Sequence, residues 1–132
     1  MSIARKESVV RAAIEAYFAA LATGDEEAWL TRHADDAVSF NPVWGPPTES
    51  LADLRRFFRG IRSAFERLSI QPDLISEAPD GAAVKWTGRA FGRNGRQVTF
   101  EGVDVFDVDD EGRIRTVWSY WDPAEVARSL GN

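Results

Sequence analysis

Apolar residues in the first half of the chain recur at the spacing of helices. Over residues 8–22 they lie three or four positions apart, which predicts an amphipathic helix with one buried face. Asp25 is a suitable N-cap for a second helix that continues through His33, and residues 50–67 carry the clearest helical pattern in the chain. Residues 37–40 form a short apolar run that is followed closely by a proline, which predicts a short strand.

The second half of the chain is dominated by runs in which apolar and polar residues alternate. These runs are separated by glycine-containing turns, and Asn94-Gly95 is typical of a two-residue hairpin turn. A short final helix follows, to about Leu130. The order of the elements predicts an α+β fold in one domain, 1–132, with helices on one face of a curved, mostly antiparallel sheet. The predicted strands cover residues 69–78, 82–92, 96–108 and 113–121.

The strand over residues 98–108 carries an acid on the face that belongs to the core. Alternate residues of a strand point to opposite faces, so one face holds Asp104 among apolar residues and a glycine. Burial of a carboxylate is unfavourable unless the group is paired, hydrogen-bonded or protonated. Asp104 is therefore a candidate for a functional site. The alternative is an acid at a strand end or edge, bonded to a neighbour or to water.

The neighbour of Asp104 across the hairpin depends on the length of the turn. With a plain two-residue turn, Lys85 lies opposite Asp104 and holds it ionised. In that register, however, the apolar residues of the preceding strand, which include Trp86, point to the opposite face from Lys85 and Asp104. Either a bulge near one of the glycines turns Trp86 inward, or a second subunit covers the outer face. The two arrangements shift the pKa of Asp104 in opposite directions.

Tyr17 is a second polar candidate, because it lies in the middle of the buried stripe of the first helix. A buried tyrosine hydroxyl needs a hydrogen-bond partner in the interior. The partner is either a backbone carbonyl, as in an ordinary core tyrosine, or a ligand in a pocket.

Composition limits the chemistry that such a pocket performs. The chain has 132 residues, of which 44% are hydrophobic and 28% charged, as in ordinary globular proteins. It has no cysteine and one histidine, which excludes disulfides, thiolate chemistry and multi-histidine metal sites within one chain. A net charge of −5 argues against nucleic acid as a partner. With no membrane-spanning run and no signal peptide evident, a cytoplasmic location is expected.

Three segments resemble the ketosteroid isomerases and, more broadly, the superfamily of nuclear transport factor two, which includes SnoaL-like polyketide cyclases. These are Tyr17 to Asp25, Ala34 to Pro42, and Val103 to Ile114 with its Val-Asp-Val-Phe and Gly-Arg-Ile pieces. The resemblance runs in order from about Val9 to Trp121. It implies a cone in which a strongly curved sheet and about three helices on its concave side enclose a deep apolar pocket. It also implies a homodimer, which we expect to form through the outer face of the sheet.

The resemblance further implies roles for individual residues. Tyr17 and Asp104 fall on the two positions that donate hydrogen bonds to the substrate oxyanion in ketosteroid isomerases. Asn41 stands where the family has the aspartate that acts as general base, and an amide cannot accept a proton at neutral pH. His33 stands where some members have a tyrosine that supports the first one. The residues expected to contact substrate are His33, Phe57, Phe58, Trp86, Val117 and Trp121.

The predicted function is an isomerase-like or cyclase-like enzyme that acts on a hydrophobic ketone, such as a steroid or polyketide. Steroid isomerisation is expected to be weak unless another group, His33 or Asp122, serves as base. One alternative is an epoxide hydrolase that uses Arg89 with Asp104, and another is a non-catalytic module that binds small molecules. No cofactor or metal is expected, because the chain lacks phosphate-binding loops, dinucleotide fingerprints and metal-binding clusters.

Overall fold

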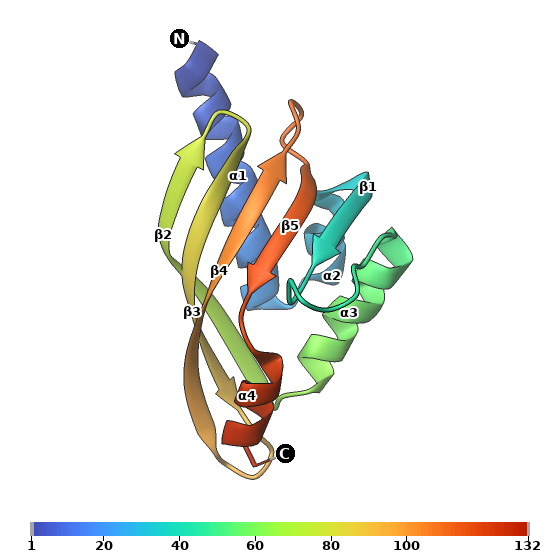
Figure 1. The fold of residues 1–132 in the computed structure, drawn as a ribbon, viewed down its shortest axis with the longest axis vertical. Coiled ribbons are helices and arrows are strands. Elements are labelled where there is room, and N and C mark those ends of the chain that lie inside the picture. The colour runs from blue at the N-terminus through green and yellow to red at the C-terminus, as the bar shows by residue number, and fades with distance from the viewer. Residues whose placement is uncertain (1, 132) are drawn as a thin grey trace.

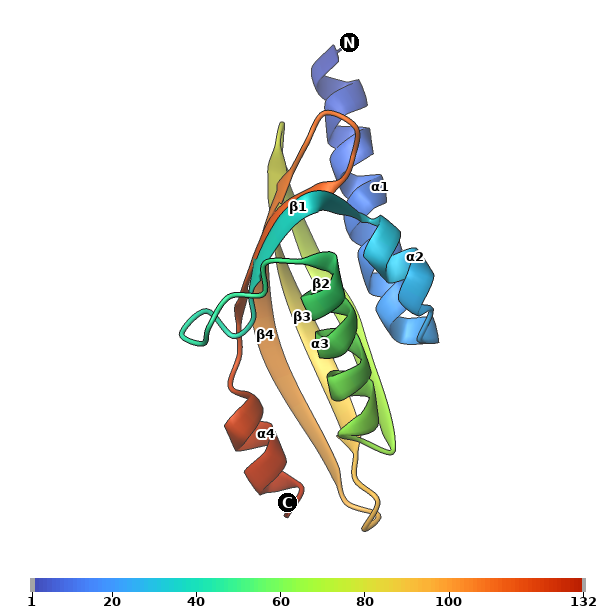
Figure 2. The same ribbon diagram turned by 90° about the vertical axis from the view of Figure 1, so that its right-hand side faces the viewer.

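In the computed structural model, the chain forms one five-stranded sheet, and helices α1, α2 and α3 lie together on one of its faces (Figures 1 and 2). The structure describes residues 2–131, and side chains from residue 9 onward. The elements are α1 Ser2–Thr23, α2 Glu26–Thr31, β1 His33–Phe40, α3 Leu51–Ser63, β2 Arg67–Ala78, β3 Gly81–Phe91, β4 Gln97–Val108, β5 Ile114–Tyr120 and α4 Pro123–Ser129. No helix in this part of the chain is long and apolar enough to cross a membrane.

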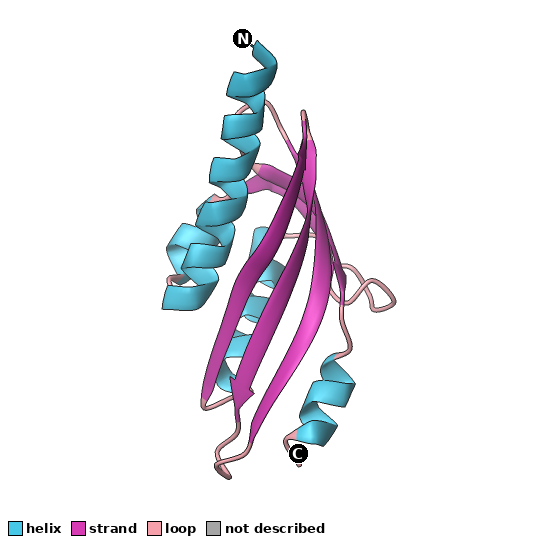
Figure 3. Cartoon of the chain, turned by 90° about the vertical axis from the view of Figure 1, so that its left-hand side faces the viewer, coloured by secondary structure: helices cyan, strands magenta, loops and turns pink. Residues whose placement is uncertain are grey.

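The sheet has the strand order β1-β5-β4-β3-β2, with β1 parallel to β5 and all other neighbours antiparallel. The α+β prediction is therefore confirmed. The long strands β2, β3 and β4 bend along their length, as Figure 3 shows. Short α4 follows β5 and lies near the turn between β3 and β4, where Asn94 Nδ2 donates to the carbonyl oxygen of Leu130 at 2.8 Å.

The helices begin where the sequence predicts. Asp25, Ser50 and Asp122 each accept a hydrogen bond at 3.1 Å from the backbone N–H three residues later. These bonds satisfy amide groups that a helix leaves free in its first turn, so each residue acts as an N-cap. The acids in the first turns of α2 and α4 add a favourable interaction with the helix dipole.

Two predicted helix ends are wrong, because strand pairing recruits the residues that follow. α2 ends at Thr31, and His33 begins β1 rather than continuing the helix. The carbonyl of Arg32 accepts from the amide of Ile114 at 2.7 Å, so β5 extends the sheet to this point. Similarly, α3 ends at Ser63, and the amide of Glu66 donates a hydrogen bond to the carbonyl of Phe91, the last residue of β3, at 2.8 Å. A backbone group that finds a partner in the sheet does not need the helical one.

The prediction of a two-residue turn between β3 and β4 is also wrong. Gly92 and Arg96 form the closing pair, with the amide of Gly92 donating to the carbonyl of Arg96 at 2.9 Å. Three residues therefore form the turn, and Gly95 in it has a φ of 84°, which glycine adopts without strain. The extra residue shifts the register by one position, and this reverses which side chains of β3 face inward.

With the shifted register, Val84 lies opposite Asp104 and Lys85 lies opposite Val103 on the outer face. Lys85 forms ion pairs there with Asp73 and Glu101, both at 2.8 Å. Trp86 faces inward with Asp104, without any bulge in this pair of strands.

Candidate active site

A narrow cavity lies between the inner face of the sheet and helices α1 and α3. Its volume is about 30 Å³, which is room for about one water molecule. Most of its lining is apolar or aromatic, as in many small-molecule sites. The lining residues are Tyr17, Phe18, Leu21, Asn41, Phe57, Ile61, Leu68, Ile70, Trp86, Asp104, Ser119 and Trp121.

The cavity brings together six of the nine residues that the sequence identifies as site residues: Tyr17, Asn41, Phe57, Trp86, Asp104 and Trp121. His33, Phe58 and Val117 do not line it, because their side chains are buried in the core behind it. Sequence reasoning did not identify Phe18, Leu21, Ile61, Leu68 and Ile70 as wall residues. Leu21 and Ile61 lie on apolar stripes that the sequence shows, but a stripe does not distinguish cavity from core.

Asp104 is 4% exposed, and two neighbours bind one of its oxygens. Trp86 donates its indole N–H to Oδ1 at 3.0 Å, and Ser119 donates its hydroxyl to the same oxygen at 2.5 Å. Burial raises the pKa of Asp104 to about 6, while the hydrogen bonds from Ser119 and Trp86 act in the opposite direction. Asp104 is therefore mainly ionised at pH 7 and takes up a proton in mildly acidic solution.

Tyr17 is enclosed by aromatic rings, with Phe106 at 5.0 Å and Phe18 at 5.2 Å between ring centroids. Burial raises the pKa of the Tyr17 hydroxyl far above its usual value, and the charge of Asp104 raises it further. The nearby indole N–H of Trp29 opposes these effects only in part. Tyr17 therefore keeps its proton and presents a hydrogen-bond donor to the cavity.

The expected support of Tyr17 by His33 is not found. The two rings lie 5.7 Å apart, but no hydrogen bond joins them, and Nδ1 of His33 instead lies 2.9 Å from the carbonyl oxygen of Trp29. Burial lowers the pKa of His33 to about 4, so the ring is neutral at pH 7. Within residues 9–131, Nε2 of His33 and Nε1 of Trp29 are buried without a hydrogen-bond partner.

Asn41 lines the cavity directly after β1, and Trp121 fixes the orientation of its amide. The indole N–H of Trp121 donates to Oδ1 of Asn41 at 2.6 Å. An indole N–H only donates, so the amide oxygen must face it and the NH₂ group is left as a donor. Asp122 is next to Trp121, but its side chain caps α4.

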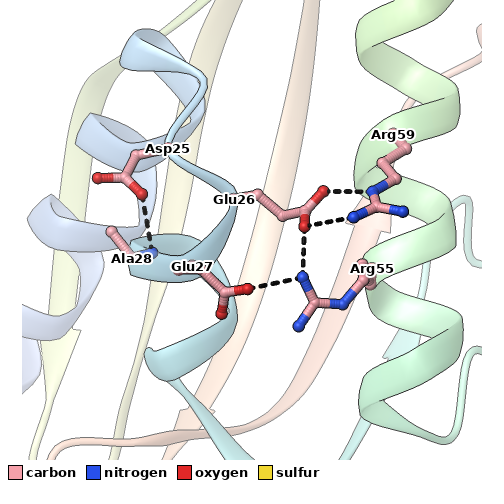
Figure 4. A network of polar contacts seen from close by, with 6 residues as sticks. All are labelled: Asp25, Glu26, Glu27, Ala28, Arg55 and Arg59. Atoms are coloured by element: carbon pink, nitrogen blue, oxygen red, sulfur yellow. Dashed lines mark hydrogen bonds and ion pairs between the residues drawn. The ribbon is translucent and has the colours of Figure 1, made fainter.

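Ion pairs join α3, which forms one wall of the cavity, to α2. α3 contributes Phe57 and Ile61 to the lining. On its other side, Arg59 pairs with Glu26 of α2 at 2.7 Å, and Arg55 pairs with both Glu26 and Glu27 (Figure 4). At this volume the cavity does not enclose a molecule as large as a steroid or polyketide.

Within the described side chains, no group of three or more carboxylates and histidines is arranged to hold a metal ion. The cavity instead combines one carboxyl group with hydroxyl, amide and indole donors in apolar surroundings. Such a set can take a proton from a carbon next to a carbonyl and stabilise the charge on the carbonyl oxygen.

Solved structures with the same fold as this chain include the following three. The epoxide hydrolase/cyclase-like enzyme SalBIII, described in pyran ring formation in polyether salinomycin, is 23% identical with a TM-score of 0.80, and the match covers 94% of this chain and 96% of SalBIII. RV0760c from Mycobacterium tuberculosis, solved with estradiol-17β-hemisuccinate, is 22% identical with a TM-score of 0.77, over 88% of this chain and 95% of the other. Δ5-3-ketosteroid isomerase from Mycobacterium sp. is 27% identical with a TM-score of 0.71, over 86% and 93%.

The sequence comparison agrees with the fold. The model of the SnoaL-like domain family matches residues 14–117, which include Tyr17, Asn41 and Asp104. The resemblance predicted from the sequence is confirmed, and the chain belongs to the SnoaL-like domain family of the nuclear transport factor two-like superfamily.

Proposed function

We propose that this protein is an enzyme that isomerises or cyclises a hydrophobic ketone through an enolate formed in the cavity. The observation that carries the proposal is a buried carboxyl, Asp104, that lines a mostly apolar cavity together with Tyr17. A carboxyl in such a place is unfavourable for stability, and perturbed acids of this kind are concentrated at functional sites.

In the proposed reaction, ionised Asp104 removes a proton from the carbon next to the ketone. The electron pair of that C–H bond moves toward the carbonyl oxygen, where Tyr17 and the NH₂ group of Asn41 donate hydrogen bonds to the enolate. Asp104 then returns the proton to another carbon, which gives an isomer. If the enolate carbon instead attacks a second carbonyl carbon of the same molecule, a ring is formed. The π electrons of that C=O bond move to its oxygen, which takes the proton back from Asp104.

Asp104 takes the proton in this scheme because no other lining residue is suited to do so. Asn41 cannot accept a proton at neutral pH, Asp122 caps α4, and His33 lies outside the cavity lining. In ketosteroid isomerases the acid at this position is instead protonated and donates a hydrogen bond. The two roles give opposite pH profiles. A base is active above the pKa of about 6, whereas a donor is active below it.

The structural relatives support a ketone substrate with a rigid apolar body. One relative is a ketosteroid isomerase, and another was solved with an estradiol derivative. The epoxide hydrolase alternative loses its expected partner for Asp104, because Arg89 is exposed on the outer face of β3.

The experiment that tests the proposal follows conversion of a β,γ-unsaturated steroid ketone to its conjugated isomer by ultraviolet absorbance. We expect slow turnover that rises with pH through about 6 and is lost in Asp104→Ala. Asn41→Asp should lower the rate, since it replaces an amide donor to the enolate with a carboxylate. A higher rate would instead assign residue 41 as the base position. If no variant reacts and no phenolic steroid binds, the enzyme proposal fails and a different binding role remains. Turnover that falls as pH rises through 6 would assign Asp104 as the protonated donor.

We further propose that two copies associate through the outer face of the sheet. Val103 and Tyr120 lie opposite each other on β4 and β5 and are 38% and 50% exposed. Beside them, the rings of Phe40 and Trp118 stack at 6.3 Å between centroids. Phe40 and Trp118 are partly buried, and a group of exposed and partly exposed apolar side chains of this kind often marks an interface.

For the interface, Val103→Lys should convert a dimer into a monomer, because it places a charge in the centre of the apolar surface. Thr99→Lys is the matched control, since Thr99 is exposed on the same face of β4. Light scattering coupled to size-exclusion chromatography gives the mass directly. A monomeric unsubstituted protein, or a dimer that survives Val103→Lys, would contradict the proposal.

A further inference from the structure

Asp104 is held by residues of the strands on either side of it. Trp86 on β3 and Ser119 on β5 both donate to Oδ1, at 3.0 and 2.5 Å. Their side chains are 2% and 1% exposed, so solvent does not readily replace either donor. Each of the three residues also lines the cavity.

This arrangement makes the two oxygens of Asp104 unequal. An indole N–H is a donor only, so Oδ1 must present a lone pair to Trp86, and it accepts from Ser119 as well. Oδ2 has no hydrogen-bond partner among the described side chains and backbone. Bonds to an ionised oxygen are stronger than bonds to a neutral one, so the two donors favour the carboxylate. A proton taken from a substrate is therefore received at Oδ2.

The sheet makes this geometry possible in two ways. Ser119 lies directly opposite Asp104 in the pairing of β5 with β4. Trp86 lies opposite Gly102, one inward-facing position away, and its indole extends over the bare Cα of that glycine toward Asp104. The contact thus depends on the absence of a side chain at residue 102.

We infer that Trp86 and Ser119 are positioning residues that hold Oδ1 of Asp104 and reserve Oδ2 for the substrate. Both residues act through Asp104. The reaction at Oδ2 rests on the proposed function, whereas the contacts that hold Oδ1 do not. Where the acid acts in its protonated form, as in ketosteroid isomerases, donors from both neighbouring strands would be a disadvantage, because they oppose protonation. Here they fit a group that begins each cycle as an ionised base.

The test is the titration of Asp104, followed by carbon-13 NMR of its carboxyl carbon in the intact protein. Ser119→Ala and Trp86→Phe should each move the midpoint upward by about one pH unit, because each removes a hydrogen bond to the charged form. Ser119→Thr keeps the hydroxyl and should restore the original midpoint. Trp44→Phe makes the same exchange at a tryptophan that is 65% exposed and should have no effect.

Turnover of the steroid ketone provides the second measurement. In Ser119→Ala and Trp86→Phe, the pH at half-maximal kcat should rise with the NMR midpoint. An unchanged midpoint in Ser119→Ala would overturn the inference, even if Trp86→Phe does not fold. If the ketone is not converted by any variant, the proposed function fails, but the titration still decides whether these residues hold Asp104.

Discussion

Replacing Asp104 with asparagine should nearly abolish turnover and at the same time make the folded protein more stable at pH 8. Asp104 is the only carboxyl that lines the cavity among the described side chains, and its loss should lower kcat by about 10²- to 10⁴-fold, the usual contribution of a general base. The variant should gain up to about 3 kcal/mol in free energy of unfolding, because it removes a buried charge whose pKa is raised to about 6. Asparagine keeps an oxygen that can accept from Trp86 and Ser119.

The direction of this gain follows from proton binding. The pKa of Asp104 rises from 3.8 in the unfolded chain to about 6 in the folded protein, so the folded state binds more protons between these values. The contribution of Asp104 to stability is therefore complete below pH 3.8 and is lost as pH rises through 6. Asparagine does not titrate, so the difference between the variant and the original protein should be small at pH 4 and largest at pH 8.

Urea unfolding at several pH values measures this difference, and Asp107→Asn is the matched control. Asp107 is on the same strand but faces outward and lies outside the cavity lining. His33 must be considered, because its pKa is lowered to about 4 and its effect on stability has the opposite sign in the same pH range. Subtracting the two curves at each pH removes the effect of His33. A variant that is less stable than the original protein at every pH would show that Asp104 is structural.

The sequence predicts the components of the site better than their contacts. Asp104 is identified because alternation in a strand is strict, and an acid among apolar residues is conspicuous. The caps of the helices are also predictable, since each depends on residues within four positions. These local rules account for the order of the elements and for the polar residues of the inner face.

The rest depends on distant pairing, which no local rule supplies. The turn at Asn94 has one residue more than expected, and this single residue replaces Lys85 with Trp86 beside Asp104. Likewise, His33 leaves the helix because β5, some 80 positions later, pairs with it. Ser119 is recognisable as an inward-facing residue, but its bond to Asp104 follows only from the register of β5 on β4.

Gly102→Ala should strongly lower the free energy of unfolding, because the inner face of β4 has no room for a methyl group at this position. A Cβ at residue 102 would lie 2.2 Å from Cζ2 of Trp86, well inside contact distance. The indole cannot easily retreat, because it packs against Phe100 and Trp121 and bonds to Asp104. Overpacking of a core and loss of a buried hydrogen bond together give an expected decrease of about 3 kcal/mol in the free energy of unfolding.

Gly60→Ala is the control for this substitution, since a Cβ at residue 60 of α3 would have no heavy atom within 4 Å. It should raise the free energy of unfolding by about 0.5 to 1 kcal/mol, the usual advantage of alanine in a helix. Urea unfolding measured by circular dichroism gives both values. If the strain arises from the indole, Trp86→Phe should cost less in the Gly102→Ala background than alone. If Trp86→Phe lowers the free energy of unfolding equally in both backgrounds, the contact between Trp86 and Asp104 does not depend on the missing side chain at Gly102.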